Sequence, residues 1–282
     1  MAPKSLFDAV QKTIASHEQL ETLDRDLSFH PSSPETATTL SPQQVENFNR
    51  DGCLMPLRVF EDDAIAKYRR YFDKLLEQTL ESGSDSYSVI DPHMGHSRVY
   101  DMMFEPRMVD RIKDLLGDNI VCWSTHCFCK FAHEEKQVSW HQDAYYWPMA
   151  ESKTVSVWLA VDDVDRENAC MQFVAGSHVH GGISHRPTTT EERNVLRFTV
   201  DGVESYGRIV DNELKAGEMS LHSDLLLHGS GPNTSDRRRC GLTFRYVDAA
   251  VQNLLDWDKC GVVVCGRDPN GHWGNPPRPA ED

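Results

Sequence analysis

The feature that most constrains the fold is a change of hydrophobic period near Asn119, where spacing typical of helices gives way to alternation typical of strands. Gly, Pro, Asn and Asp residues between the alternating segments predict turns. So many short strands in a row predict a mainly β protein with flanking helices, built on a double-stranded β-helix, the cupin-like jelly roll. The expected strands are 119–131, 137–143, 153–161, 169–175, 195–200, 207–210, 218–221, 225–229 and 240–247.

Helices are expected mainly before this β region. Capping signals and helical spacing predict them over about 5–20, 42–49, 62–80 and 108–116. The polar stretch 83–100 is expected to be a loop. Its two histidines, His93 and His96, should be exposed to solvent rather than bind a metal, because Pro92 and Gly95 disfavour a helix there.

The chain is expected to form a single domain over 1–282. Its parts would be a helical region of about 1–117, a jelly-roll core of about 118–247 and a tail of 248–282, irregular from Gly266 onward. The predicted N-terminal helix could pack on the domain or on a second subunit, so a homodimer stays open.

Composition limits the partners and the location. The sequence has 44 acidic and 29 basic residues, a formal net charge of −15, and such a field repels nucleic acid and anionic membrane surfaces. We therefore expect no nucleic-acid or membrane partner. The sequence shows neither a secretion signal nor a long apolar run, which favours a cytoplasmic protein. Its eight cysteines lie mostly in apolar or β-like segments and are expected to be buried free thiols.

Three side chains in the β region have the chemistry of a metal site. His141 and Asp143 lie two residues apart, so on an extended strand their side chains point to the same face. Far downstream, His228 offers a third ligand. Two histidines and one carboxylate on one face of an iron leave its opposite face open for oxygen and a co-substrate. Arg239, eleven residues beyond His228, is a cation able to grip a carboxylate with two hydrogen bonds.

This ordered set resembles the Fe(II)/2-oxoglutarate-dependent dioxygenases of the phytanoyl-CoA dioxygenase family. The resemblance implies that His141, Asp143 and His228 bind Fe(II), that Arg239 holds the far carboxylate of 2-oxoglutarate, and that O2 is the second co-substrate. It extends over about 41–247 and is carried by Asp51-Gly52, Trp140-His141-Gln142-Asp143, Gly176-Ser177-His178, His228-Gly229-Ser230-Gly231-Pro232-Asn233-Thr234-Ser235 and Arg239.

Alternation along the last core strand distinguishes Arg239 from its two arginine neighbours. It places Arg239 on the same face as Gly241, where a small neighbour leaves room for a co-substrate. Arg237 and Arg238 are expected to be exposed charges at a turn, although a shift of one residue in the register would exchange the roles.

Gln142, Lys130 and Trp158 are further candidates for the co-substrate pocket. In the family that the chain resembles, a glutamine between the ligands often touches the co-substrate, although alternation would turn Gln142 outward. Lys130 and Trp158 lie on flanking strands and could line the pocket, and packing explains Trp158 equally well. The stretch His222-Ser223-Asp224 repeats the His-x-Asp pattern but is expected to be a loop, because no third ligand and arginine follow it at matching spacing.

The sequence thus predicts an enzyme that hydroxylates or desaturates a small molecule while 2-oxoglutarate is decarboxylated to succinate. Two alternatives stay open: a metal oxygenase that does not use 2-oxoglutarate, and a jelly-roll binding protein without catalysis. Tyr145-Tyr146-Trp147, directly after Asp143, should border the pocket mouth, where aromatic faces suit a cation or an apolar body. We therefore expect a small neutral or cationic substrate in preference to a coenzyme A thioester.

Overall fold

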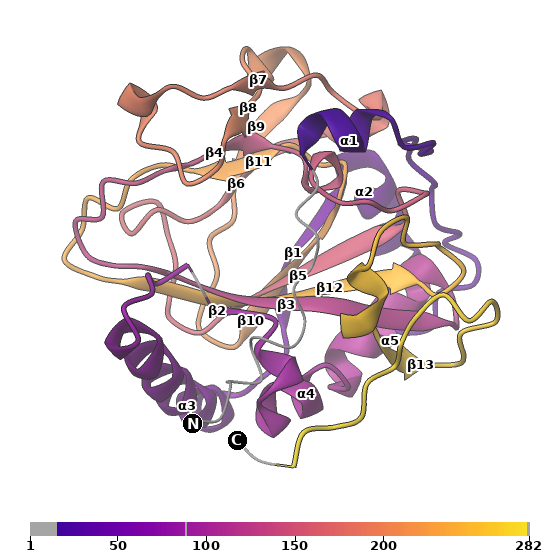
Figure 1. The fold of residues 1–282 in the computed structure, drawn as a ribbon, viewed down its shortest axis with the longest axis horizontal. Coiled ribbons are helices and arrows are strands. Elements are labelled where there is room, and N and C mark those ends of the chain that lie inside the picture. Colours follow the sequence, from indigo (N-terminus) through magenta and orange to yellow (C-terminus); the bar gives the residue numbers. More distant parts are fainter. Residues whose placement is uncertain (1–15, 88, 281–282) are drawn as a thin grey trace.

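Two antiparallel sheets form the centre of the molecule (Figure 1). The computed structural model describes residues 16–87 and 89–280. The larger sheet has the strand order β1-β10-β5-β12-β3-β13, with β2 also paired to β3, and the smaller sheet has the order β4-β11-β6-β9. Figure 1 shows the smaller sheet on one side of the larger sheet and helices α3, α4 and α5 on the other. This is the jelly roll that the alternation predicted.

The strands agree with the predicted segments to within a few residues over most of the core. They are β1 (Cys53–Arg58), β2 (Val89–Ile90), β3 (Ile120–Lys130), β4 (Val138–His141), β5 (Thr154–Ala160), β6 (Gln172–Ala175), β7 (Arg186–Pro187), β8 (Phe198–Thr199), β9 (Arg208–Asp211), β10 (Glu218–Ser223), β11 (His228–Ser230), β12 (Arg239–Asp248) and β13 (Val262–Cys265).

The described helices are α1 (His17–Glu21), α2 (Pro42–Asp51), α3 (Asp62–Glu81), α4 (Ser97–Met102) and α5 (Pro106–Leu116). Of these, α2, α3 and α5 agree with the predicted helices to within two residues. The capping box at Ser41 and the left-handed Gly52 bound α2 as the sequence suggested. Most of the predicted helix over 5–20 lies outside the described residues. None of the helices in the described part of the chain has both the length and the apolar character needed to cross a bilayer.

Four segments differ from the predictions. Helix α4 begins within the stretch 83–100, which was expected to be a loop. Strand β1 joins the larger sheet from within the region expected to be helical, and β13 adds a strand from the tail. The fourth difference is His93, which is fully buried rather than exposed: its ring nitrogens lie 2.8 Å from Thr125 Oγ1 and 2.9 Å from the Cys260 carbonyl oxygen. The prediction for His93 was wrong because the strand pair β2–β3 draws this stretch against the sheet.

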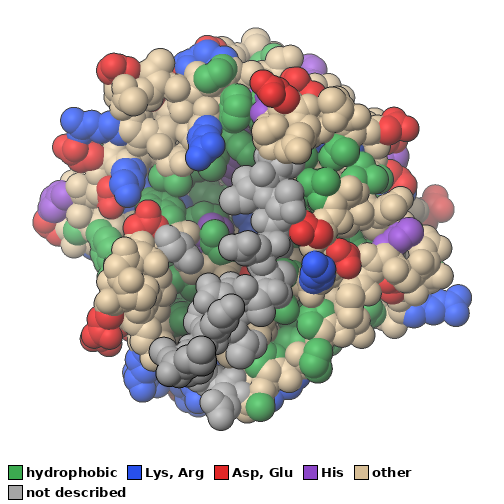
Figure 2. Space-filling view, in the orientation of Figure 1, with side chains coloured by type: hydrophobic (Ala, Val, Ile, Leu, Met, Phe, Trp, Pro, Cys, Tyr) green, Lys and Arg blue, Asp and Glu red, His purple; other side chains and the backbone are tan. Residues whose placement is uncertain are grey.

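The two faces of β12 have different environments. Leu242, Phe244 and Tyr246 belong to the main apolar cluster, which also contains the buried faces of α3 and α5. The alternate residues point the other way, toward the space between the two sheets, and they include Arg239 and Arg245. This confirms the predicted alternation. Figure 2 shows hydrophobic side chains gathered in a hollow near the middle of the view, between the positions of the two sheets.

The described cysteines are all free thiols, and seven of the eight are buried. Burial raises the pKa of the Cys53 thiol to about 12, so it stays protonated at neutral pH. The sequence-based expectation of buried free thiols is therefore confirmed.

Candidate metal centre and co-substrate pocket

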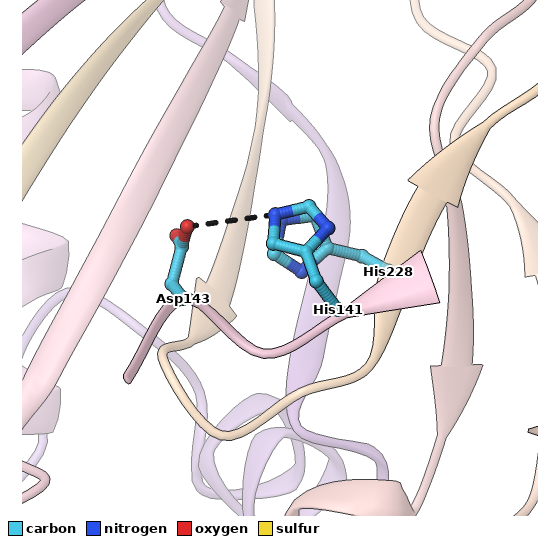
Figure 3. Close-up of side chains that lie close together, drawn as sticks. All are labelled: His141, Asp143 and His228. Carbon is cyan, nitrogen blue, oxygen red and sulfur yellow. Dashed lines mark ion pairs between the residues drawn. The ribbon is translucent and has the colours of Figure 1, made fainter. Parts of the chain in front are cut away.

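His141, Asp143 and His228 lie together between the sheets (Figure 3). His141 is the last residue of β4 and pairs with His228, the first residue of β11. Asp143 follows two residues later in a short 3-10 turn. One ligand atom from each side chain lies within 4.8 Å of the others, and His141 Nε2 is 3.8 Å from Asp143 Oδ1. In the described part of the chain, these three form the one cluster with this geometry.

Backbone carbonyl groups fix the orientation of both histidines. Nδ1 of His141 lies 2.8 Å from the Ser139 oxygen, and Nδ1 of His228 lies 2.9 Å from the Leu226 oxygen. A carbonyl oxygen only accepts hydrogen bonds, so Nδ1 carries the proton in each ring and Nε2 keeps its lone pair. An imidazole held in this way presents Nε2 to a metal ion.

The electrostatics favour the protonation states that bind metals. Burial and the neighbouring His228 lower the pKa of His141 to about 3, so its ring is neutral at physiological pH. Burial acts to raise the pKa of Asp143, but the contact with His222 and the charges of neighbouring groups outweigh it and leave this pKa below its ordinary value. A neutral imidazole and an ionised carboxylate are the forms that coordinate a metal.

His222 also belongs to this site, contrary to the prediction that it lies in a loop. The ladder between β10 and β5 continues through His222 to Ser223, so His222 is a strand residue opposite Ser156. Its side chain is buried, and its Nε2 lies 3.8 Å from Asp143 Oδ2. Ser156 Oγ donates to the same carboxylate oxygen at 3.3 Å. The turn begins only after Ser223, and alternation continued two residues further would have found His222.

Arg239 lies on the inner face of β12 and is only 2% exposed. Among the described residues no hydrogen bond or ion pair satisfies its guanidinium group, and its Nε is a buried donor without a partner. The guanidinium lies over the Trp158 ring, 5.6 Å from its centre. A Cβ atom at Gly241 would meet this indole at 2.1 Å, so only glycine lets the ring lie there.

Lys130 faces Arg239 directly in the register of β3 and β12. It is fully buried, and its Nζ donates to Ser230 Oγ at 3.0 Å and to the Gly231 carbonyl oxygen at 2.5 Å. Burial and the charge of Arg239 lower the pKa of Lys130 to about 7. Like charges directly opposite one another destabilise a strand pair, so this pair is suited to an anion between the two side chains.

Gln142 has a different environment from the other predicted pocket residues. Its Nε2 donates to the carbonyl oxygens of Gly181 and Leu225 at 2.8 and 2.6 Å, and its Oε1 accepts from the Ile183 amide at 2.7 Å. Through these hydrogen bonds the Gln142 side chain connects the end of the strand that carries His141 to the segment 181–183 and to Leu225, three residues before His228. A contact between Gln142 and a co-substrate stays a prediction.

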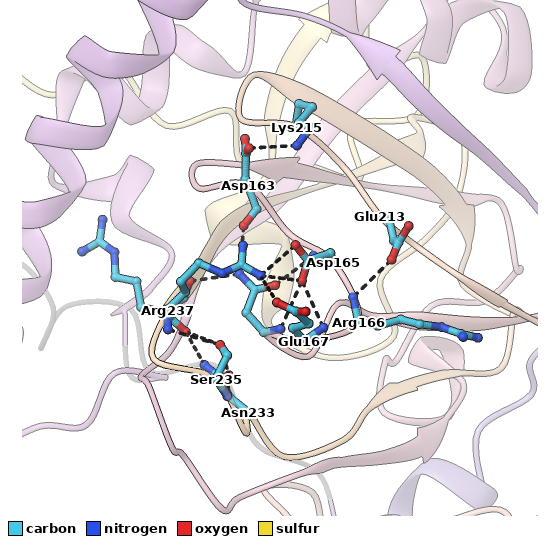
Figure 4. A network of polar contacts seen from close by, with 11 residues as sticks. Asp163, Asp165, Arg166, Glu167, Glu213, Lys215, Asn233, Ser235 and Arg237 are labelled. Carbon is cyan, nitrogen blue, oxygen red and sulfur yellow. Dashed lines mark hydrogen bonds and ion pairs between the residues drawn. The ribbon is translucent and has the colours of Figure 1, made fainter.

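The two preceding arginines lie outside the pocket. Arg237 is exposed and donates to Asp165, within the surface network that Figure 4 shows. Arg238 was expected to be exposed but is partly buried, because it pairs with Asp162 and Asp73, at 2.9 and 2.6 Å. Both guanidinium groups have acidic partners, which separates them clearly from Arg239.

Aromatic side chains surround the metal ligands where the chain leaves β4. The ring of Tyr145 stacks on His185 with centroids 3.8 Å apart, and the ring of Tyr146 meets His141 edge-on at 6.0 Å. Trp147 is buried against Trp123. Tyr146 therefore lies against a metal ligand and Trp147 belongs to the interior, whereas a pocket mouth bordered by these rings stays a prediction.

Comparisons with known proteins agree with this arrangement. Residues 48–241, more than half of the chain, match the family described as phytanoyl-CoA dioxygenase (PhyH). The chain therefore belongs to that family, as its motifs suggested, and the predicted fold and enzyme class, a 2-oxoglutarate-dependent non-haem iron dioxygenase, are confirmed.

Three similar proteins illustrate the range of the family. A probable alpha-ketoglutarate-dependent hypophosphite dioxygenase of Stutzerimonas stutzeri is 28% identical over 64% of this chain and 64% of that protein, which is less than two thirds of its length. An L-proline trans-4-hydroxylase of Streptomyces griseoviridis is 26% identical over 71% of this chain and 83% of that protein. The solved structure of the apo non-heme monooxygenase ThoJ has a TM-score of 0.70 at 26% identity and covers 84% of this chain and 88% of that one.

Proposed function

We propose that this chain is a single-domain oxygenase in which His141, Asp143 and His228 bind Fe(II) and Arg239 binds 2-oxoglutarate. The observation that carries the proposal is Arg239, a buried arginine without an anionic partner among the described residues, in a fold that also holds a buried His-Asp-His cluster. An uncompensated buried cation is costly, and a carboxylate with two acceptor oxygens matches the guanidinium fork.

The residues of the chain have distinct roles in this proposal. The Ser139 and Leu226 carbonyl groups hold the two imidazoles so that Nε2 faces the metal. Lys130 adds a second cation at the far carboxylate of the co-substrate, and Trp158 forms an apolar wall beside Arg239. Bound Fe(II) would supply the chemistry by which O2 oxidises 2-oxoglutarate to succinate and CO2 and also oxidises the substrate, with one oxygen atom going to each when the substrate is hydroxylated.

The substrate is proposed to be a small molecule that is hydroxylated or desaturated. The relatives described above are named for hypophosphite and for L-proline, so the family does not single out one substrate. A cytoplasmic location, the lack of nucleic-acid and membrane partners, and a homodimer stay predictions.

The test is anaerobic titration of the purified protein with Fe(II) and then with 2-oxoglutarate. A charge-transfer band that requires both is expected from the wild-type protein. Arg239→Met should raise the 2-oxoglutarate concentration needed for the band by roughly 30-fold or more, because a buried carboxylate without its partner costs about 2–5 kcal/mol. Arg237→Met, on the exposed neighbour, is the matched control and should leave the titration unchanged.

The two alternatives predict other outcomes. A metal oxygenase that does not use 2-oxoglutarate would bind Fe(II) without any band on addition of the keto acid. A binding protein without catalysis would show neither the band nor turnover of O2. Equal effects of Arg237→Met and Arg239→Met would contradict the assignment of Arg239.

A further inference from the structure

A second cation, Arg245, lies on the same inner face of β12 as Arg239. The two are six residues apart, which on a strand rising ~3.3 Å per residue separates their Cα atoms by about 20 Å. Arg245 pairs in register with Ser124 on β3 and with Ser156 on β5. A molecule of the length of 2-oxoglutarate held by Arg239 and the metal does not extend to Arg245, so the two arginines serve different ligands.

Arg245 lies on the metal side of the barrel interior. Its strand neighbour Ser156 donates to Oδ2 of Asp143 at 3.3 Å. A group bound by Arg245 would therefore be close to the metal centre.

The donors of Arg245 are only partly used. The guanidinium lies over the Trp147 ring, 5.3 Å from its centre, and Nη1 donates to Ser124 Oγ at 3.4 Å. Nε is buried and has no partner, and no acidic side chain of the described residues lies within ion-pair distance of Arg245. Stacking on an aromatic face does not engage the in-plane N–H groups, and the geometry of the Nε–Nη2 edge matches a planar acceptor with two oxygens.

The charge balance of the interior also favours an anion. Fe(II), Asp143, Arg239 and dianionic 2-oxoglutarate together carry no net charge, so a protonated Lys130 and Arg245 each add a positive charge that this set does not balance. Asp91 Oδ1 accepts from Ser124 Oγ at 2.7 Å, so this carboxylate is connected to Arg245 through the Ser124 hydroxyl group. A buried or partly buried cation paired in this indirect way is stabilised by a bound anion.

We propose that Arg245 anchors a carboxylate of the substrate, so that the substrates of this enzyme are small organic acids. The inference rests on the proposed function, since it assigns the substrate class to the same metal site. It replaces the expectation of a neutral or cationic substrate, which rested on the aromatic residues after Asp143. Trp147 was expected to offer its face to the substrate, whereas in the structure that face holds Arg245.

The test measures binding to the anaerobic protein loaded with Fe(II) and 2-oxoglutarate. The probes are small carboxylic acids, from acetate and L-proline to benzoate and hexanoate, each paired with its primary amide. Calorimetry and the shift of the charge-transfer band report binding without turnover. We expect at least one acid to bind at least about tenfold more tightly than its amide. Arg245→Gln should remove that preference, and Arg245→Lys should keep part of it.

The controls separate this inference from the proposed function. A charge-transfer band that forms normally in Arg245→Gln shows that the fold, the metal and the co-substrate site are intact, and Arg237→Gln should behave as the wild type. Three outcomes would overturn the inference and leave the proposed function intact. The amides could bind as tightly as the acids, or the preference for acids could persist in Arg245→Gln. Alternatively, none of the acids could bind to a wild-type protein that forms the band. A wild-type protein that forms no band would instead overturn the proposed function.

Discussion

The two faces of β12 differ in how completely their polar atoms are satisfied. On the outer face, Leu242 and Phe244 are fully buried in the apolar cluster, and the one hydroxyl group there, on Tyr246, donates to the Met103 carbonyl oxygen at 3.0 Å. On the inner face, the Nε atoms of Arg239 and Arg245 and the hydroxyl group of Thr243 are buried without partners.

Folding alone does not favour buried donors without partners, because each costs the free energy of its lost hydration. The outer face therefore stabilises the sheet, and the inner face keeps polar groups for ligands at some cost in stability. The comparison predicts that substitutions on the outer face lower stability without changing ligand affinity. Substitutions on the inner face should change ligand affinity without lowering stability.

The largest effect is expected from the metal ligands. Alanine at His141, Asp143 or His228 should reduce iron-dependent turnover to background, because each substitution removes one of three ligands at a site with no spare donor in the described cluster. The fold should persist, since the ligands lie apart from the apolar cluster on the outer face. Bound iron and circular dichroism check both parts, and turnover retained by His141→Ala would refute the ligand assignment.

The outer face should respond in the opposite way. Leu242→Ala is expected to lower the free energy of unfolding by about 2–5 kcal/mol, because it leaves a cavity in a fully buried position. Urea unfolding measures this, and the 2-oxoglutarate requirement of the folded protein should not change.

Thr243→Val is the matched substitution one residue along on the inner face. It removes a buried hydroxyl group without a partner at nearly constant volume, so stability should stay the same or rise. A loss of stability as large as that of Leu242→Ala would contradict the distinction between the two faces.

A smaller effect is expected at His222, which touches a ligand without being one. His222→Ala should weaken iron binding by about 10–100-fold, the usual range for residues that hold metal ligands in place. His222→Gln, which keeps a donor toward Asp143, should recover part of that loss. Iron affinity that is identical in the wild type and in both variants would show that the 3.8 Å contact has no role in binding.

The sequence predicted this site largely because its decisive positions follow simple alternation. Alternation placed His141 and Asp143 on one face and Arg239 on the face of Gly241, since the period of a strand is two, although the strand itself ends at His141 and Asp143 lies in the turn that follows. The partners of the metal ligands were harder to predict, because they depend on which strands are adjacent. Register between β10 and β5, which the sequence does not reveal, brings His222 to Asp143.

Long-range pairing also explains the error at His93. Proline and glycine around it correctly indicated an irregular chain, and β2 then holds that chain against β3. An irregular segment can be buried when its polar atoms find partners in the sheet, as the His93 ring does with Thr125 and the Cys260 carbonyl group. Composition alone could not supply those partners.

The smallest predicted effect is the pH dependence of 2-oxoglutarate affinity, which we attribute to Lys130, opposite Arg239 in the strand pair. In the free protein, burial and Arg239 lower the pKa of Lys130 to about 7. A bound dicarboxylate favours the charged form and moves this pKa back toward its ordinary value. Binding then takes up a proton above pH 7, so 2-oxoglutarate affinity should be constant below about pH 7 and fall by up to about tenfold per pH unit above it.

Lys130→Met distinguishes this cause from a general effect of pH on the protein. The variant lacks the titrating amine, so its affinity should be lower near neutral pH but nearly independent of pH between about 7 and 9. Anaerobic titrations of the charge-transfer band at several pH values measure both slopes. If the 2-oxoglutarate affinity fell equally with pH in the two proteins, Lys130 would not interact with the co-substrate. Arg239 would then bind the far carboxylate without Lys130.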